Sequence, residues 1–147
     1  MRIALGSDHA GVELKTHVAQ ALEGRQLAFQ DFGPSTDVPV DYPDYAASVA
    51  KPVASGQFDR GILICGTGVG MAIAANKVPG IRAASVNDVS GARLCREHND
   101  ANILTLGART LSVEQALSIV QTFLETPFEG GRHKRRVDKI HSIESTS

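Results

Sequence analysis

The chain has 147 residues, of which 42% are hydrophobic, and its 15 basic and 16 acidic side chains leave a formal net charge of −1. This length is typical of one domain with a full hydrophobic core, so we expect residues 1–147 to form a single domain. A near-neutral chain has no overall attraction for nucleic acid or for an anionic membrane, and we expect neither as a partner. Two cysteines are too few for a disulfide framework, and no signal peptide or membrane-length apolar run is recognisable. The sequence therefore predicts a soluble, cytoplasmic protein.

Strand-like and helix-like segments alternate along the chain. Apolar runs predict strands at 3–6, 28–32, 62–64, 82–86 and 103–106, and helical periodicity predicts helices at 12–22, 44–54, 71–77, 89–97, 112–125 and 132–143. The clearest helix follows Ser112, a good N-capping residue, and has one apolar stripe. Pro52 should kink or end its helix, and residues from about 141 to 147 should form a frayed tail.

This alternation predicts a three-layer α/β/α fold of the Rossmann-like, flavodoxin-like kind. Its five-stranded parallel sheet should have the order 2-1-3-4-5, with an additional C-terminal helix. Ligands of such sheets bind at the carboxyl ends of the strands where the order reverses, here between the first and third strands. Residues 7–11 leave the first strand and residues 65–70 leave the third. We therefore expect Asp8, His9, Cys65 and Thr67 to line one crevice.

A glycine-rich turn, Cys-Gly-Thr-Gly-Val-Gly at 65–70, connects the third strand to the next helix. Free backbone N–H groups and the helix dipole make such a turn suitable for an anion, and they also favour a cysteine thiolate. Alternatively, Cys65 is a small core residue that ends a buried strand.

Known motifs that bind phosphate or metal fit this turn poorly. A P-loop and a cysteine phosphatase would place lysine and arginine, respectively, where Met71 stands. A Rossmann fingerprint would follow the first strand, although Asp88 lies about twenty residues further on, so a dinucleotide site stays open. Cys65 and Cys95 lack the paired spacing of structural zinc ligands, and we expect no metal.

The remaining polar residues suit proton abstraction beside a carbonyl. A base, such as a cysteine, can remove the proton while backbone donors stabilise an enediolate oxygen, and arginines can clamp a phosphate. Each group also has a structural interpretation. Asp8 can cap a helix, His98 can decorate a helix C-terminus, and the basic residues 132–136 can form a solvated helix face.

Several motifs, taken in order, resemble ribose-5-phosphate isomerase type B, a family that also includes galactose-6-phosphate and allose-6-phosphate isomerases. They lie at 6–11, 65–70, 74–77, 96–102 and 131–133, and the resemblance extends from residue 1 to about residue 140. It implies an aldose–ketose isomerase of the pentose phosphate pathway that interconverts ribose 5-phosphate and ribulose 5-phosphate. The alternatives are a six-carbon sugar phosphate as substrate, or a non-catalytic module that binds phosphate or a nucleotide.

The resemblance also implies roles for individual residues. Cys65 matches the general base, and His98 matches the residue that opens the sugar ring with help from Thr67. One branch of the family instead uses a glutamate at the position of Met71, so Cys65 is the base expected here. The matching substrate contacts are Asp8, His9, Tyr42, Gly66, Gly68, Gly70 and Asn99, with Arg109, Arg132 and Arg136 at the phosphate.

The family needs no metal and no organic cofactor. It forms homodimers, often paired into tetramers, with sites built from both subunits. The resemblance therefore implies that the neighbouring subunit could supply the phosphate clamp.

Overall fold

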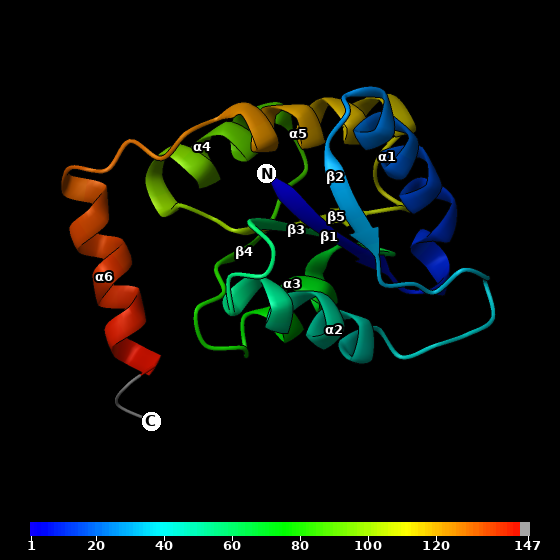
Figure 1. Ribbon diagram of the computed structural model, residues 1–147, viewed down its shortest axis with the longest axis horizontal. Helices are drawn as coiled ribbons and strands as arrows, with labels where there is room; N and C mark the ends of the chain where they lie inside the picture. The colour runs from blue at the N-terminus through cyan, green and yellow to red at the C-terminus, as the bar shows by residue number, and fades with distance from the viewer. Residues whose placement is uncertain (145–147) are drawn as a thin grey trace.

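A five-stranded parallel sheet forms the centre of the computed structural model, which describes residues 1–144 (Figure 1). Its strands are β1 (Arg2–Ser7), β2 (Ala28–Asp31), β3 (Arg60–Cys65), β4 (Ala83–Ser85) and β5 (Ile103–Gly107). Their spatial order is β2-β1-β3-β5-β4. The Rossmann-like fold is confirmed, but the expected order 2-1-3-4-5 is wrong in its last two positions. All residues of β5 are buried, whereas the short β4 is partly exposed, so β5 takes the interior place and β4 the edge.

Helices cover both faces of this sheet. The α-helices of the described residues are α1 (Val12–Gly24), α2 (Tyr42–Ala54), α3 (Val69–Ala75), α4 (Val89–Asn99), α5 (Val113–Glu125) and α6 (Arg132–Glu144), of which the first five cover the sheet. Helices α1, α4 and α5 lie on one face, and α2 and α3 lie on the other (Figure 1). A parallel sheet covered in this way buries both faces of its central strands, which explains the unbroken apolar run of β3.

Successive residues of β3 point into two separate cores. Ile62 and Ile64 belong to the core under α1, α4 and α5. Leu63 and Cys65 belong to the core under α2 and α3. Because side chains alternate along a strand, this register places the Cys65 sulfur on the α2–α3 face at the carboxyl end of β3.

The ends of several helices follow the expected chemistry. Ser112 and Gln115 form a reciprocal capping box at the start of α5. Pro52 lies in the last turn of α2, which ends two residues later, as expected of a helix-terminating proline.

Helix α6 packs against α4 and projects at the end of the molecule opposite α1 (Figure 1). It continues to Glu144, so fraying from about residue 141 is wrong for residues 141–144. The reason is a tertiary contact, because a Glu144 carboxylate oxygen accepts a 2.9 Å hydrogen bond from the Gly80 amide. The rest of the expected tail, 145–147, lies outside the described residues. Over the described part of the chain, no helix is long and apolar enough to cross a membrane.

Candidate active site

A cavity of about 430 Å³ opens at the carboxyl ends of β1 and β3. Its lining residues are Asp8, Tyr42, Cys65, Gly66, Thr67, Val69, Gly70, Ile73 and Arg109. The strand exchange at the other side of the sheet leaves β1 and β3 adjacent, so the predicted switch point is confirmed. Asp8, Cys65 and Thr67 therefore meet as expected, and Tyr42 and Arg109 join them.

The sulfur of Cys65 is held by the turn that follows it. Cys65 is only 5% exposed, and the Gly68 amide donates a hydrogen bond to Sγ across 3.2 Å. Gly68 has a φ of +80°, a left-handed conformation that glycine adopts without strain and that turns its amide back toward the sulfur. A backbone N–H donated to sulfur stabilises negative charge on that atom. Gly68 acts through this contact and does not itself line the cavity.

Strand β5 and the loop after it hold the same turn from the other side. The Ala108 amide donates to the Cys65 carbonyl at 2.8 Å, and the Arg109 amide donates to the Gly66 carbonyl at 3.0 Å. The Arg109 guanidinium lies against Gly66, where an added Cβ would be 3.1 Å from Nη1. The buried Thr105 hydroxyl donates to the Gly68 carbonyl at 2.7 Å. Sequence reasoning missed Thr105, whose only signal is a hydroxyl between two apolar residues of a buried strand.

Asp8 and His9 occupy different places at the end of β1. One oxygen of the Asp8 carboxylate accepts from the amides of Ala10 and Gly11, so Asp8 caps the short 3-10 turn His9–Gly11 that leads into α1, and it also lines the cavity. His9 lies in a neighbouring hollow with residues 35–37 and is not part of the lining of the Cys65 cavity. The Val40 amide donates to His9 Nδ1 at 3.1 Å, and this bond turns the ring toward the 35–41 loop.

Tyr42 and two apolar residues form the outer part of the cavity. The ring of Tyr42 packs against Gly70, where an added Cβ would lie 2.7 Å from the ring. Val69 and Ile73 line the cavity, yet they are 52% and 59% exposed. Sequence reasoning missed both, because they read as ordinary apolar positions of a helix. Exposed apolar residues at the rim of a cavity are typical of a surface that another molecule covers.

The other predicted site residues lie near the amino ends of the strands, at the end of the sheet opposite Cys65. Helix α4 runs against the strand direction, and the Asn102 carbonyl just beyond it accepts a hydrogen bond from the Gly61 amide at the start of β3. Cys65 is at the other end of β3, roughly 13 Å away at about 3.3 Å per residue. One chain therefore does not bring His98 and Asn99, on α4, together with Cys65. The same applies to Arg132 and Arg136, which are on the first turns of α6 beside the end of α4.

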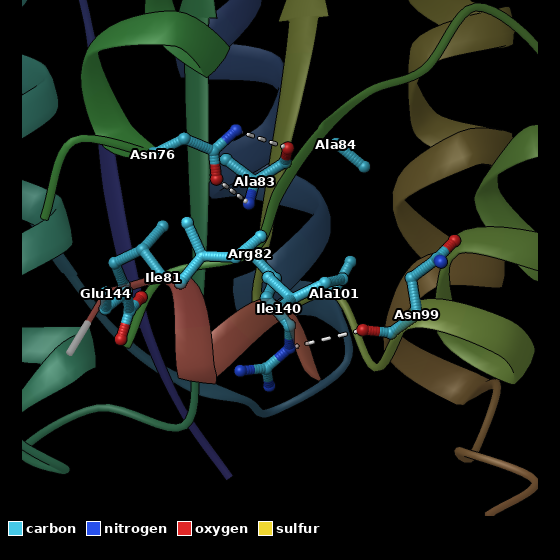
Figure 2. Close-up of a pocket in the computed structure, with 10 residues that line it drawn as sticks. Asn76, Ile81, Arg82, Ala83, Ala84, Asn99, Ala101, Ile140 and Glu144 are labelled. Carbon is cyan, nitrogen blue, oxygen red and sulfur yellow. Dashed lines mark hydrogen bonds between the residues drawn. The ribbon is translucent and has the colours of Figure 1, made fainter. Parts of the chain in front are cut away.

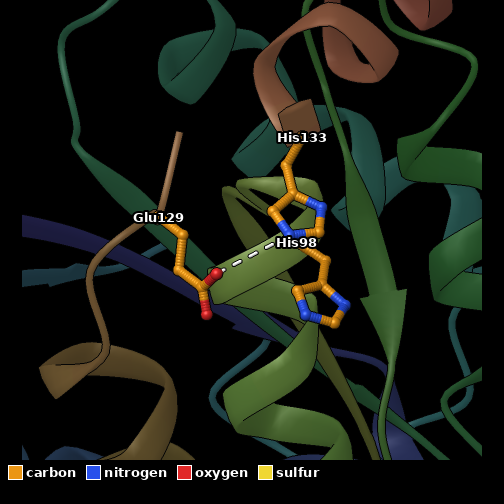
Figure 3. Close-up of side chains that lie close together, drawn as sticks. All are labelled: His98, Glu129 and His133. Atoms are coloured by element: carbon orange, nitrogen blue, oxygen red, sulfur yellow. Dashed lines mark ion pairs between the residues drawn. The ribbon is translucent and has the colours of Figure 1, made fainter. Parts of the chain in front are cut away.

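His98 is stacked on His133 from α6 (Figure 3). The ring centroids are 4.2 Å apart and the planes differ by 13°. Burial lowers the pKa of His133, and the positive charges of His98, Arg132 and Arg136 act in the same direction against the carboxylate of Glu129. The neutral form of the His133 ring is therefore favoured in the folded chain.

A larger hollow of about 470 Å³ lies between the β4 edge and α6 (Figure 2). Its lining is mainly apolar and includes Ile81, Ala101 and Ile140. Its polar groups are bonded to one another: Arg82 Nε donates to the Asn99 carbonyl, and the Asn76 side chain bonds both backbone groups of Ala83. This hollow holds no nucleophile, so the cavity at Cys65 is the better candidate for chemistry.

The two cysteines differ in their surroundings. Burial raises the pKa of Cys95 to about 11, although the nearby Arg96 acts in the opposite direction. The Cys95 thiol donates to the Ala92 carbonyl inside α4. This environment agrees with a packing role for Cys95 and leaves Cys65 as the thiol placed at a cavity.

Comparison with known proteins is consistent with this geometry. Residues 3–140 match the family described as Ribose/Galactose Isomerase. The chain is 47% identical over 145 residues to the putative sugar phosphate isomerase YwlF of Bacillus subtilis, covering 98% of this chain and 97% of the relative. It is 47% identical over 143 residues to ribose-5-phosphate isomerase B of Escherichia coli, covering 97% and 96%.

Solved structures agree over almost the whole chain. Ribose-5-phosphate isomerase B of Clostridium thermocellum superposes with a TM-score of 0.98 at 53% identity, covering 99% of both chains. The Mycoplasma genitalium enzyme with bound ribulose-5-phosphate gives a TM-score of 0.96 at 44% identity, covering 99% of this chain and 97% of that one. Fold and site together define an aldose–ketose isomerase. The chain belongs to the ribose/galactose isomerase family, in the branch of the type B ribose-5-phosphate isomerases.

Proposed function

We propose that this chain interconverts ribose 5-phosphate and ribulose 5-phosphate in the cavity at Cys65. The observation that carries the proposal is the Cys65 sulfur, which lies at the cavity wall and accepts a hydrogen bond from the Gly68 amide. The Mycoplasma genitalium relative, which has bound ribulose-5-phosphate, supports the choice of substrate.

The reaction needs one base that can serve two neighbouring carbons. The Cys65 thiolate takes the proton from C2 of the open-chain aldose, and the electron pair of that C–H bond forms the C1=C2 bond of an enediolate. The negative charge of the enediolate lies on the former C1 carbonyl oxygen, which takes up the proton that the 2-hydroxyl gives up. The sulfur then returns its proton to C1, and the oxygen on C2 becomes the carbonyl of the ketose. Thr67 suits a role beside the sugar because its Oγ1 already accepts from the Val69 amide, which leaves its hydroxyl hydrogen for a substrate oxygen.

Ring opening and part of the phosphate binding are assigned to a second copy of the chain. His98, Asn99, Arg132 and Arg136 gather near the α4–α6 contact, remote from Cys65 of their own chain. We infer that the α4–α6 end of one subunit covers the Cys65 cavity of its partner in a homodimer. The exposed Val69 and Ile73 at the cavity rim would then be buried at the subunit contact. Arg109 would contribute the positive charge from the subunit that carries Cys65.

His9 and Tyr42 are proposed as substrate contacts from the Cys65 subunit. Tyr42 lines the cavity, and His9 follows Asp8 of the cavity lining and itself lines a separate hollow. The mechanism uses no metal and no organic cofactor, because the steps above are proton transfers between carbon, oxygen and sulfur. It does require a reduced thiol, and both cysteines are free. A reducing cytoplasm is the compartment that fits this requirement.

The decisive experiment follows conversion of ribose 5-phosphate in D₂O by wild type, Cys65→Ala and the matched control Cys95→Ala. We expect ketose formation with solvent deuterium in wild type and Cys95→Ala, and loss of both in Cys65→Ala with its folding intact. Full activity of Cys65→Ala would remove this residue from the mechanism.

The substrate series discriminates the alternatives. The description of the matched family names galactose as well as ribose. Allose 6-phosphate and galactose 6-phosphate are therefore tested beside ribose 5-phosphate. Turnover of a six-carbon sugar phosphate without turnover of ribose 5-phosphate would show that the six-carbon compound is the substrate. Ligand binding without any turnover would favour a non-catalytic phosphate- or nucleotide-binding module.

A further inference from the structure

Three potential metal ligands converge where α4, the 129–131 turn and α6 meet. His98, Glu129 and His133 each offer one ligand atom, and these atoms all lie within 4.8 Å of one another. Figure 3 shows the two imidazole rings side by side, with the Glu129 carboxylate reaching toward them. The Glu129 carboxylate oxygen is 3.6 Å from His133 Nε2.

The backbone holds these residues together before any ion arrives. The Glu129 amide donates to the Glu97 carbonyl at 3.1 Å, which fixes Glu129 beside the residue that precedes His98. His133 is 8% exposed, and its amide donates to the Gly130 carbonyl in the first turn of α6. The three ligands therefore come from segments that are already joined by hydrogen bonds.

Two histidines and one carboxylate are a ligand set that zinc accepts, and a site with three protein ligands keeps a position open. We propose that His98, Glu129 and His133 bind a zinc ion or a similar divalent transition metal. The two imidazole rings are stacked with their planes only 13° apart, so metal binding requires at least one ring to rotate out of the stack and direct its nitrogen at the ion. Arg132 and Arg136 oppose a cation here, whereas the Glu129 carboxylate, which already opposes their effect on His133, would contact the ion directly.

Metal binding has a consequence for catalysis, and this part rests on the proposed function. An imidazole nitrogen that coordinates zinc has no lone pair left to exchange a proton with the ring oxygen of the sugar. Occupancy of the cluster therefore inhibits conversion of ribose 5-phosphate by removing His98 from the reaction. The metal is an inhibitor at this site and not a cofactor.

Binding is tested first, by equilibrium dialysis of the tag-free chain against zinc alone, with cobalt(II) absorption as a report on ligand type. The variants are Glu129→Gln and His133→Phe, which remove one ligand each, and Asp138→Asn as a matched carboxylate control on α6. We expect one zinc per chain in wild type and Asp138→Asn. Loss of a ligand should weaken binding by at least about tenfold, the lower end of the effect of losing an outer-shell partner.

A Cys65→Ser variant separates the cluster from thiol binding. Retention of zinc by Cys65→Ser, with no thiolate band in the cobalt spectrum, supports the cluster. Equal binding by wild type, Glu129→Gln and His133→Phe overturns the inference, as does loss of binding in Cys65→Ser alone.

Inhibition is then measured with ribose 5-phosphate, where Glu129→Gln should resist zinc concentrations that inhibit wild type and Asp138→Asn. Equal inhibition of Glu129→Gln and wild type would overturn the inhibitory role. If the metal-free enzyme shows no isomerase activity, the proposed function fails, and the dialysis result still decides the metal site.

Discussion

The buried hydroxyl of Thr105 donates a 2.7 Å hydrogen bond to the carbonyl oxygen of Gly68. The amide of Gly68 in turn donates to the sulfur of Cys65. Gly68 thus connects the Thr105 side chain on β5 to the sulfur of the proposed base. Thr105 itself contacts neither the cavity nor the sugar. Its proposed role is to position the turn, because it holds Gly68 on the carbonyl side while the amide of the same residue faces the sulfur.

Replacement of Thr105 by valine should therefore impair the turn more than the fold. The change removes the hydroxyl donor, while the Gly68 carbonyl still accepts from the Ala72 amide, so we expect a cost of about 0.5–1.5 kcal/mol in the free energy of unfolding. Misplacement of the Gly68 amide should lower kcat by an amount on the order of 10- to 100-fold, with a smaller change in KM. Steady-state kinetics and urea unfolding measure the two effects. Thr16→Val is a matched control, because the Thr16 hydroxyl bonds only within α1. Wild-type kcat in Thr105→Val would contradict the positioning role.

His98→Asn should separate ring opening from proton transfer. Ribose 5-phosphate is largely a closed ring, whereas ribulose 5-phosphate cannot close a five-membered ring because its 5-hydroxyl carries the phosphate. We therefore expect His98→Asn to lose conversion of ribose 5-phosphate while it still exchanges the C1 hydrogen of ribulose 5-phosphate with D₂O. Proton NMR of the ketose measures this exchange. Loss of exchange together with conversion, in a folded variant, would show that His98 does more than open the ring.

Mixing two inactive variants tests whether the site is shared between subunits. A heterodimer of Cys65→Ala and His98→Asn has one site with both substitutions and one site with both wild-type residues. Random reassortment of a symmetric dimer should therefore restore about a quarter of wild-type activity. The measurement is activity toward ribose 5-phosphate after mild denaturation and joint refolding, with each variant refolded alone as its control. No recovery despite heterodimer formation would place both residues in the site of one chain.

Alkylation should distinguish the two cysteines. Burial raises the pKa of Cys95 to about 11, so its thiol stays protonated and unreactive between about pH 7 and about pH 9 while the chain is folded. Cys65 lies at the cavity, and inorganic phosphate or substrate should slow its modification. Peptide mass spectrometry after iodoacetamide treatment reports both sites. Modification of Cys95 as fast as Cys65 in this range would show that α4 opens readily.

Local pattern was sufficient for much of the fold and for the centre of the site. The apolar run of β3 and the glycines after Cys65 specify a strand that ends in a turn, and any order with β1 beside β3 joins Asp8 to that turn. The order of β4 and β5 in the sheet depends instead on how the burial of one strand compares with that of the other. Each segment alone reads as a strand, and only their relative burial decides which is at the edge.

The rest of the site depends on relations that no single segment contains. His9 turns away because the Val40 amide, thirty-one residues later, bonds to its ring. Thr105 has the appearance of a core strand residue, and its partner is a backbone carbonyl, which leaves no trace in the sequence. The remoteness of His98 from Cys65 follows from the direction of α4, so the motifs around the two residues lie at opposite ends of the strands within one chain.

The side chain of Asn76 occupies the place that a sixth strand would take. Its amide nitrogen donates to the Ala83 carbonyl at 3.0 Å, and its amide oxygen accepts from the Ala83 amide at 2.8 Å. These are the two groups through which the β4 edge would pair with a strand from another molecule. Sheet-to-sheet joining of copies through Ala83 is blocked by a single side chain, and the sheet stays finite at this border. A strand from another molecule therefore finds both backbone groups of Ala83 already bonded.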